Sequence, residues 1–336
     1  MSDPSQHLVT APSSSTSSLS AKALEQLQML GHYPVLLREV FQYAQAKSGE
    51  VWVDCTMGRG GHALALAQQG ATVIALDQDL QAIELISQNP MYQAIQPVHG
   101  NFREIKKILK NLGIQKVDGI LADLGVSSPQ LDQADRGFSF RLNAPLDMRM
   151  DRTKGQTALE WMRTQKVEEI ARVLRDYGEE PFAYPIAKMM KVWVNQPDEA
   201  LGTTSLAQAI AQIIPMKVQR QKNIHPATLS FQALRIAVND ELSALENLLA
   251  DAPSLLKDHG RFLVISFHSL EDRLVKKSFQ ALTQPLPAPR RGLPPPTQDA
   301  IAFKLLFKGV VEADETELSQ NPRSRSAKLR GVIKQK

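Results

Sequence analysis

The feature that most constrains the fold is the alternation of short apolar strands with helices between residues 50 and 124. Hydrophobic patterning predicts strands at residues 50–56, 71–76, 95–99 and 117–124, separated by helices at 62–69, 80–88 and 104–112. An amphipathic helix at residues 34–45 precedes them. Strands that alternate with helices form a parallel sheet with right-handed crossovers. We therefore predict an α/β chain with a Rossmann-like sheet.

A long segment interrupts this alternation before the next parallel strand, which is predicted at residues 261–267. A complete strand–helix–strand unit needs only about 30 residues, far fewer than the interruption holds, so the excess must form an inserted domain. Its pattern is helical, with a capping box at 157–160 and helices at 167–177, 182–194, 205–214 and, as one long helix, from 227 through 249. Gly178 is the expected stop of the helix at 167–177.

The two ends of the chain complete this division. Residues 303–311 and 326–334 are expected to close the sheet as an antiparallel pair, after a Pro-rich loop at 284–296. Residues 1–20 are rich in Ser, Thr and Pro and hold too few large apolar side chains to offset their ordering entropy. We expect a disordered tail over residues 1–31, a Rossmann-like domain over 32–133 and 240–336, and an inserted, mostly helical domain over 134–239.

Composition narrows the setting in which such a chain works. The 336 residues hold one cysteine, Cys55, which excludes an internal disulfide framework and favours a cytoplasmic, reducing compartment. No segment approaches the roughly 18 consecutive apolar residues of a membrane span, so we expect no membrane partner. The formal net charge of +4 is weak support for a nucleic-acid partner, and the clustering of basic residues matters more.

A glycine-rich turn between the first strand and the first helix is the strongest local signal of a ligand site. It reads Asp54-Cys-Thr-Met-Gly-Arg-Gly-Gly-His62, and its glycines let the backbone approach a ligand that faces the amides of the following helix. Asp77 ends the second strand, where a carboxylate can accept both hydrogen bonds of a ribose diol. Together these features predict a cofactor that contains adenosine.

The spacing in this turn argues against a pyrophosphate cofactor, because it is not the G-x-G-x-x-G of dinucleotide sites. Asp54 ends the first strand and Asp123 the fourth, at the sheet edge where such folds bind ligands. Negative potential there suits a cofactor with an ammonium and a sulfonium group, as in S-adenosylmethionine. The alternative is that these carboxylates cap the strand ends and bind no ligand.

Longer motifs run through the chain in order. They are D-C-T-M-G-R-G-G-H, D-L-G-V-S-S-P-Q-L-D, R-G-F-S-F, P-L-D-M-R-M-D, F-Q-A-L-R-I-A-V-N, S-F-H-S-L-E-D-R and N-P-R-S-R-S. With them the chain resembles the bacterial RsmH (MraW) methyltransferases from about His32 to the C-terminus. The resemblance implies a class I methyltransferase sheet with an inserted RNA-recognition domain and S-adenosyl-L-methionine as cofactor. It also implies methylation of the exocyclic N(4) amine of a cytidine in the decoding centre of 16S rRNA.

The resemblance further implies a set of cofactor contacts that follows the pocket from the first turn to the methyl group. They are Gly60, Gly61 and His62 in the turn, Asp77 at the ribose, Phe102 near the adenine, and Asp123 and Gln130 around the methionine portion and the transferred methyl. Two positions depart from the usual pattern. Thr228-Leu-Ser230 lacks the arginine of a frequent Thr-Arg-Thr, which could alter an RNA contact, and Asp258-His-Gly-Arg261 replaces Pro-Gly-Gly-Arg in a turn.

The residue inventory favours an amine target over a ring carbon. Methylation of cytosine carbon 5 needs a cysteine nucleophile, and Cys55 lies inside the cofactor turn, where it suits a small turn residue. An amine needs only acceptors that orient it and a route for its proton. Asp123, or a nearby backbone carbonyl, is our candidate acceptor, in a loop that lacks the second Pro and the aromatic of the Asp/Asn-Pro-Pro-aromatic loops. We expect a structural role for His268 and no catalytic metal.

Basic residues gather in three segments that we expect to contact RNA, because arginine pairs with phosphate and stacks on bases. These segments contain Arg136, Arg141, Arg149 and Arg152, then Lys217, Arg220, Lys222, His225 and Arg235, and finally Arg323, Arg325, Lys328 and Arg330. The alternative for any one of them is a solvated surface charge. The expected partner is 16S rRNA within the small ribosomal subunit, presenting a flipped-out cytidine. The oligomeric state stays open between a monomer and a weak homodimer.

Two other functions compete with this interpretation. One is a nicotinamide-dependent oxidoreductase, against which the missing G-x-G-x-x-G spacing and Asp54 count. The other is a non-catalytic RNA-binding or assembly factor on the same fold. Intact Gly60, Gly61, Asp77 and Asp123 count against that second possibility.

Overall fold

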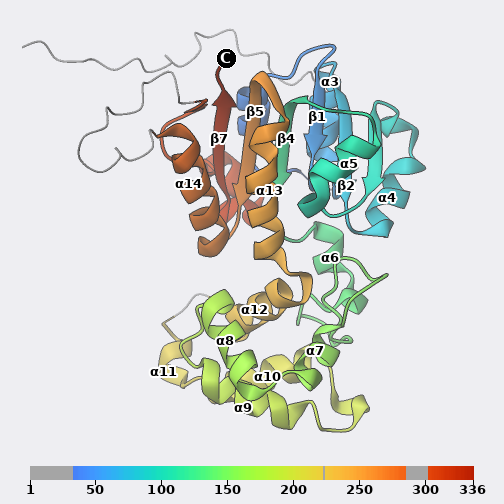
Figure 1. Cartoon of the computed structure of the whole chain (residues 1–336). Coiled ribbons are helices and arrows are strands. Elements are labelled where there is room, and N and C mark those ends of the chain that lie inside the picture. Colours follow the sequence, from blue (N-terminus) through green and yellow to red (C-terminus); the bar gives the residue numbers. More distant parts are fainter. Residues whose placement is uncertain (1–32, 222–223, 285–301) are drawn as a thin grey trace, which may run out of the picture.

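The computed structural model describes residues 33–221, 224–284 and 302–336. Figure 1 shows them as a sheet flanked by helices, with a separate cluster of helices packed beyond one end of the sheet. The expected disordered tail, nearly all of the Pro-rich loop and Lys222 lie outside the described residues.

The sheet carries the strands in the order β3-β2-β1-β4-β5-β7-β6. Its strands are β1 (Val51–Asp54), β2 (Thr72–Asp77), β3 (Ile95–His99), β4 (Val117–Asp123), β5 (Leu256–Ser266), β6 (Phe303–Leu305) and β7 (Lys328–Lys334). The first five pair in parallel, and β7 runs antiparallel between β5 and β6. The predicted antiparallel closure is confirmed, although the strand expected at 303–311 is shorter and only Val311 beyond it bridges β7. β5 also begins earlier than predicted.

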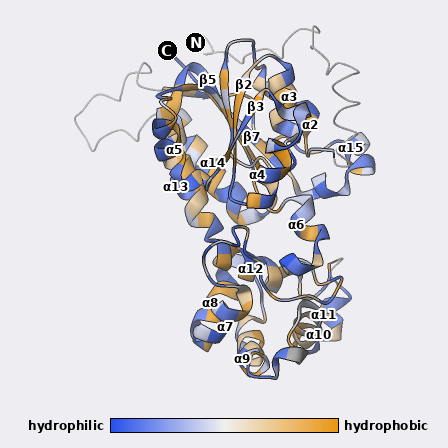
Figure 2. Ribbon diagram, turned by 90° about the vertical axis from the view of Figure 1, so that its right-hand side faces the viewer, coloured by the Kyte–Doolittle hydropathy of each residue, from blue (hydrophilic) through white to orange (hydrophobic). Residues whose placement is uncertain are grey.

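Both faces of the sheet are covered by helices, because successive strand side chains point to opposite sides. On β1, buried Trp52 belongs to one apolar core and its neighbour Val53 to another. The first core is covered by α2 (Leu37–Ala44), α3 (Gly61–Gln68) and α4 (Leu80–Ser87), and the second by α5 (Ile105–Asn111), α13 (Glu241–Leu255) and α14 (Ser269–Thr283). Figure 2 shows hydrophobic residues concentrated along the strands, between helices of mixed character. A short α15 (Glu315–Gln320) lies near the C-terminus.

The inserted segment forms helices with an apolar core of their own, which runs from Phe138 to Leu234. After α6 (Ser128–Asp132) come α7 (Ala158–Thr164), α8 (Val167–Gly178), α9 (Ala183–Trp193), α10 (Thr203–Ile213), α11 (Met216–Gln219) and α12 (Thr228–Asn239). The capping box predicted at 157–160 is present, with Thr157 and Glu160 bonded reciprocally. Gly178 is the last residue of α8, not its stop, because Glu179 takes the left-handed conformation (φ 50°). The division at residues 134 and 240 remains our proposal.

The predicted long helix from 227 through 249 is wrong, because the chain breaks it at Asp240. Asp240 is left-handed (φ 49°) and separates α12 from α13. Arg103 holds this residue from the sheet side, donating to its Oδ2 and to its backbone oxygen at 2.9 Å each. The preceding Asn239 accepts the Met150 amide at 2.7 Å and donates to the Met148 carbonyl at 2.8 Å. The break thus fastens the inserted helices to both the sheet and their own loop.

A buried ion pair makes the second link between the sheet and the inserted segment. Asp79, the N-cap of α4, pairs with Arg136 Nη1 at 2.5 Å, and the Arg136 side chain is 1% exposed. Arg136 Nη2 donates to the Arg149 and Met150 carbonyls at 3.1 Å each. The expected contact of Arg136 with RNA is therefore wrong, because its guanidinium is buried and both terminal nitrogens are bonded within the fold.

Within the described ranges, no helix is long and apolar enough to cross a membrane.

Replacing Arg136 by alanine should destabilise the fold strongly. The buried Asp79 carboxylate would lose its charge partner, which costs about 3–5 kcal/mol in comparable sites. Lys107→Ala is the control, because Lys107 pairs with Glu104 at the surface, where both side chains are more than half exposed. That loss should stay below about 1 kcal/mol. Urea denaturation measures both free energies of unfolding, and equal losses would contradict this account.

Candidate active site

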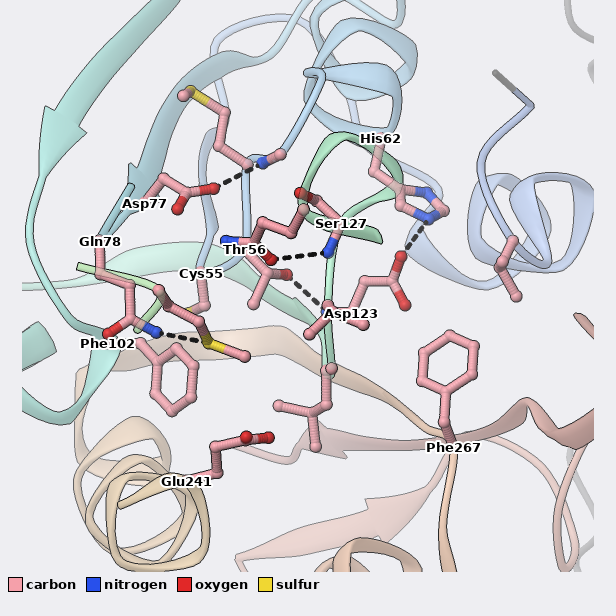
Figure 3. Close-up of a pocket in the computed structure, with 18 of the residues that line it drawn as sticks. Cys55, Thr56, His62, Asp77, Gln78, Phe102, Asp123, Ser127, Glu241 and Phe267 are labelled. Carbon is pink, nitrogen blue, oxygen red and sulfur yellow. Dashed lines mark hydrogen bonds and ion pairs between the residues drawn. The ribbon is translucent and has the colours of Figure 1, made fainter. Parts of the chain in front are cut away.

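A pocket opens at the carboxyl ends of β1, β2, β4 and β5 (Figure 3). It holds about 1310 Å³ of space between protein atoms, open solvent at its mouth included. Its walls come from the turn after β1, the ends of β2 and β4, the β5–α14 connection and the start of α13, with Met150 and Asn239 contributed from the inserted segment. The pocket therefore lies where the two parts of the chain meet.

The turn after β1 is held from behind by Asp54. This side chain is buried, and its Oδ1 accepts the Thr56 amide at 3.0 Å. Burial raises the pKa of Asp54 to about 6. The Thr56 hydroxyl oxygen accepts the Asp123 amide at 2.7 Å and so joins the ends of β1 and β4. We expected Asp54 to face a ligand, but it is not among the residues that line the pocket. Its carboxylate supports the turn instead.

The two glycines before His62 allow the turn to pack tightly. Gly60 is left-handed (φ 77°), and a Cβ there would lie 2.8 Å from Ile86 and Tyr92 side-chain carbons. A Cβ on Gly61 would lie 2.3 Å from Pro34 Cγ. Gly61 lines the pocket and Gly60 does not. Gly60 is the N-cap of α3, where its left-handed conformation starts the helix.

Asp77 lines the pocket at the end of β2. Its two oxygens accept backbone amides, Oδ2 from Gly58 at 2.8 Å and Oδ1 from Asp79 at 2.9 Å. Burial raises the pKa of Asp77 to about 6, and these hydrogen bonds oppose that rise. Each carboxylate oxygen has a further lone pair for a ligand hydroxyl.

His62 and Asp123 face each other at one end of the pocket (Figure 3). His62 Nε2 lies 3.5 Å from Asp123 Oδ2. The ring is buried, and among the described residues neither its nitrogens nor Asp123 Oδ1 has a hydrogen-bond partner. Burial lowers the pKa of His62, but the interaction with Asp123 and the charge of Asp54 outweigh it and raise the pKa overall. The pair is therefore a polar centre with spare donors and acceptors.

Phe102 and Gln130 also line the pocket, as expected from the resemblance. Gln130 is engaged on both sides: its Nε2 donates to Asp79 at 3.1 Å, and its Oε1 accepts the Ser127 amide at 3.0 Å. This amide therefore fixes the loop after β4 and the N-terminus of α6. The Gln130 side chain thus lines the pocket while its amide nitrogen and its amide oxygen are both hydrogen-bonded within the fold.

Several lining residues were missed from the sequence, above all Phe267, Glu271 and Glu241. Glu241 forms a two-bonded ion pair with Arg235, at 2.8 and 2.9 Å. Glu271 pairs with His268 Nε2 at 3.1 Å, which supports the structural role expected of His268. The S-F-H-S-L-E-D-R motif was the available signal, but it did not show that its Phe and Glu point into the pocket.

Cys55 lines the pocket as a buried thiol. Burial, and to a lesser extent the charge of Asp54, raises its pKa well above the ordinary value. A thiol with a raised pKa is a poor nucleophile, so Cys55 is not suited to a covalent step on a ring carbon.

Some of the basic residues expected to contact RNA form ion pairs within the fold, and others are exposed. Arg235 is bound to Glu241, Arg149 to Asp147, and Arg330 to Asp272 at 2.8 Å, so their charges are used within the fold. Arg323 lines the pocket and contacts Ser128 and Asp132. Arg141 and Arg325 are exposed, and contact between such residues and RNA remains our proposal. In the described part of the chain, no group of His, Cys, Asp or Glu is arranged to hold a metal ion.

The strand order with an antiparallel β7, together with a pocket of strand-end carboxylates, is the architecture of a Rossmann-like class I methyltransferase. Comparison with known proteins agrees. The family model described as the MraW methylase family matches residues 29–335. The chain belongs to the MraW methylase family.

Individual relatives cover nearly the same length. "Ribosomal RNA small subunit methyltransferase H" of Anaeromyxobacter sp. (strain K) is 47% identical over 306 residues, which cover 90% of this chain and 97% of the relative. The protein of the same name from Myxococcus xanthus (strain DK1622) is 47% identical over 310 residues, with the same coverage. Among solved structures, TrmN from Thermus thermophilus aligns at 13% identity with a TM-score of 0.39, over 89% of this chain and 48% of that one. The fold class therefore rests on the strand order itself.

The His62–Asp123 pair predicts a measurable titration. The pKa of His62 should lie above 6.5, so protonation of this ring stabilises the fold below that pH, and the contribution is lost as the pH rises through the raised pKa. In Asp123→Asn, burial should dominate and bring the pKa below 6.5. NMR of histidine-labelled protein follows the ring signals, and an unchanged pKa in the variant would refute the pairing.

Proposed function

We propose that the chain transfers a methyl group from S-adenosyl-L-methionine to the exocyclic N(4) amine of a cytidine in the decoding centre of 16S rRNA, within the small ribosomal subunit. The observation that carries the proposal is the single pocket that joins the glycine-rich turn, Asp77 and Asp123 in a chain of the methylase family. The names of the relatives support small-subunit ribosomal RNA as the substrate class.

The pocket residues fit this cofactor. Asp77 can accept the ribose hydroxyls, and Phe102, close by in the same wall, offers an apolar face to the adenine (Figure 3). Gly61 and His62 form the turn under the methionine portion. Asp123 Oδ1, buried and without a hydrogen-bond partner among the described residues, is an acceptor suited to a cationic group or an amine. When bound, the cofactor supplies the electrophilic methyl group.

The protein's own task is to place the amine in line with that methyl group. Correct placement of two reactants supplies roughly 7–11 kcal/mol towards such a displacement. Asp123 lies at the end of β4, where a carboxylate can accept a hydrogen bond from the amine and hold its lone pair towards the cofactor. No covalent step on the protein is needed, in keeping with the buried Cys55 thiol.

The two competing functions are not favoured. A nicotinamide oxidoreductase does not agree with membership of the methylase family. A non-catalytic assembly factor would have no need for the unpartnered Asp123 Oδ1 in a buried pocket wall, because such an atom costs stability unless a ligand uses it.

Asp123→Asn should lower the rate of methyl transfer by about 100-fold or more, because the negative charge and one of the two acceptor oxygens are lost, and an amide that donates takes the place of that oxygen. Small subunits that lack the modification are incubated with the enzyme, and N(4)-methylcytidine in their 16S rRNA is measured by mass spectrometry. Lys107→Ala, on the surface of α5, serves as control. Wild-type transfer by Asp123→Asn would remove this role, and no transfer by the wild type would remove the proposed function.

Cofactor affinity should depend on the ionisation of Asp77. Its pKa of about 6 means that the carboxylate is protonated in acid and cannot accept both ribose hydroxyls. The affinity for S-adenosylhomocysteine should therefore rise between about pH 5 and 7, with a midpoint at the Asp77 pKa of about 6. Calorimetric titration across this range measures it. Asp77→Asn should bind more weakly and lose the midpoint, and a midpoint that persists in the variant would assign it to another group.

A further inference from the structure

The loop after β4 lacks the aromatic side chain that such loops carry in other amino methyltransferases, and the fold supplies one from the neighbouring strand. β4 and β5 pair in parallel, with Asp123 opposite Ile265. Phe267 therefore leaves the end of β5 beside the loop that follows Asp123. A Cβ on Gly125 would lie 3.5 Å from Phe267 Cδ2, so the ring lies beside the loop at Gly125.

Phe267 occupies the end of the pocket opposite the adenine site. Its half-buried ring lines the pocket. Figure 3 shows it on the far side of Asp123 from Asp77 and Phe102. A cofactor that reaches from Asp77 towards Asp123 would leave this ring free for a second molecule.

The backbone at Phe267 is held by buried polar contacts with Glu271. Glu271, 3% exposed, accepts the backbone amide of Phe267 at 2.9 Å and that of His268 at 3.3 Å. The other oxygen of Glu271 pairs with the His268 ring at 3.1 Å. These contacts belong to the capping box that begins α14, and the same carboxylate also fixes the backbone at Phe267. Such fixing is what a surface for orienting a reactant requires.

Resting on the proposed function, we propose that Phe267 is the stacking surface for the target cytosine, and that Glu271 and His268 position it. A base that is flipped out of its stack is held by aromatic side chains on its face and by hydrogen bonds on its edge. Phe267 offers the face, and Asp123, across the same end of the pocket, offers an acceptor for the amine. The base would thus present its N(4) edge to the centre of the pocket.

Phe267→Leu and Phe267→Tyr test this assignment, because only the second keeps an aromatic face. Phe267→Leu should lower kcat/KM for small subunits at least about 5-fold, the lower end of what one lost base–aromatic stack produces, through KM more than kcat. Its affinity for S-adenosylhomocysteine should stay unchanged. Phe267→Tyr should stay within about 3-fold of the wild type on the same scale. Phe307→Leu, which removes a half-buried ring packed on Tyr43, is the matched control for lost packing.

Binding of cytidine to protein saturated with S-adenosylhomocysteine gives a second readout that needs no turnover. Ligand-observed NMR should show weaker binding by Phe267→Leu than by the wild type, Phe267→Tyr or Phe307→Leu. If Phe267→Leu matched Phe267→Tyr both in kcat/KM and in cytidine binding, the assignment would be overturned. A wild type that binds cytidine through Phe267 but transfers no methyl group would overturn the proposed function alone, and a wild type that does neither would overturn both.

Discussion

The pocket depends on the parallel register of β1, β2, β4 and β5. Asp54 pairs with Leu121 and Asp123 with Ile265, so these strands end at nearly one level. Residues that follow each strand are therefore delivered to a single edge of the sheet. Two bonds across that edge, from the Gly58 amide to Asp77 and from the Asp123 amide to Thr56, then hold the loops together. Without this register the carboxylates would lie on separate surfaces.

Much of the fold could be predicted because hydrophobic periodicity reports burial directly. The strand at Ile95–His99 is observed with its predicted bounds, and β4 differs from prediction by one residue. The break between α12 and α13 could not be predicted, since it rests on a left-handed Asp240 with no glycine or proline to mark it. Its stabilising contacts come from Arg103 and the loop at Met150, which are remote in the sequence.

The site was predictable only where local chemistry and a family resemblance met. The glycine-rich turn and Asp77 carry their signal in their own spacing. Phe267 does not, because a phenylalanine after an apolar strand is indistinguishable from a core residue until the neighbouring strand is known. Arg136 misled for a related reason. Its position among other arginines is typical of a solvated basic surface, and only the structure shows Asp79 enclosing its charge.

Asp79 belongs to both parts of the molecule at once. Its backbone amide donates to Asp77 at 2.9 Å, and its carboxylate holds Arg136 of the inserted segment. The inserted helices and the carboxylate at the end of β2 thus both contact Asp79. A rotation of those helices on docking with a bulky particle would strain these contacts and alter the hydrogen-bond geometry at the nucleoside end. The affinity for the docked particle and the affinity for the cofactor would then be coupled, and each ligand would change the affinity for the other by the same factor.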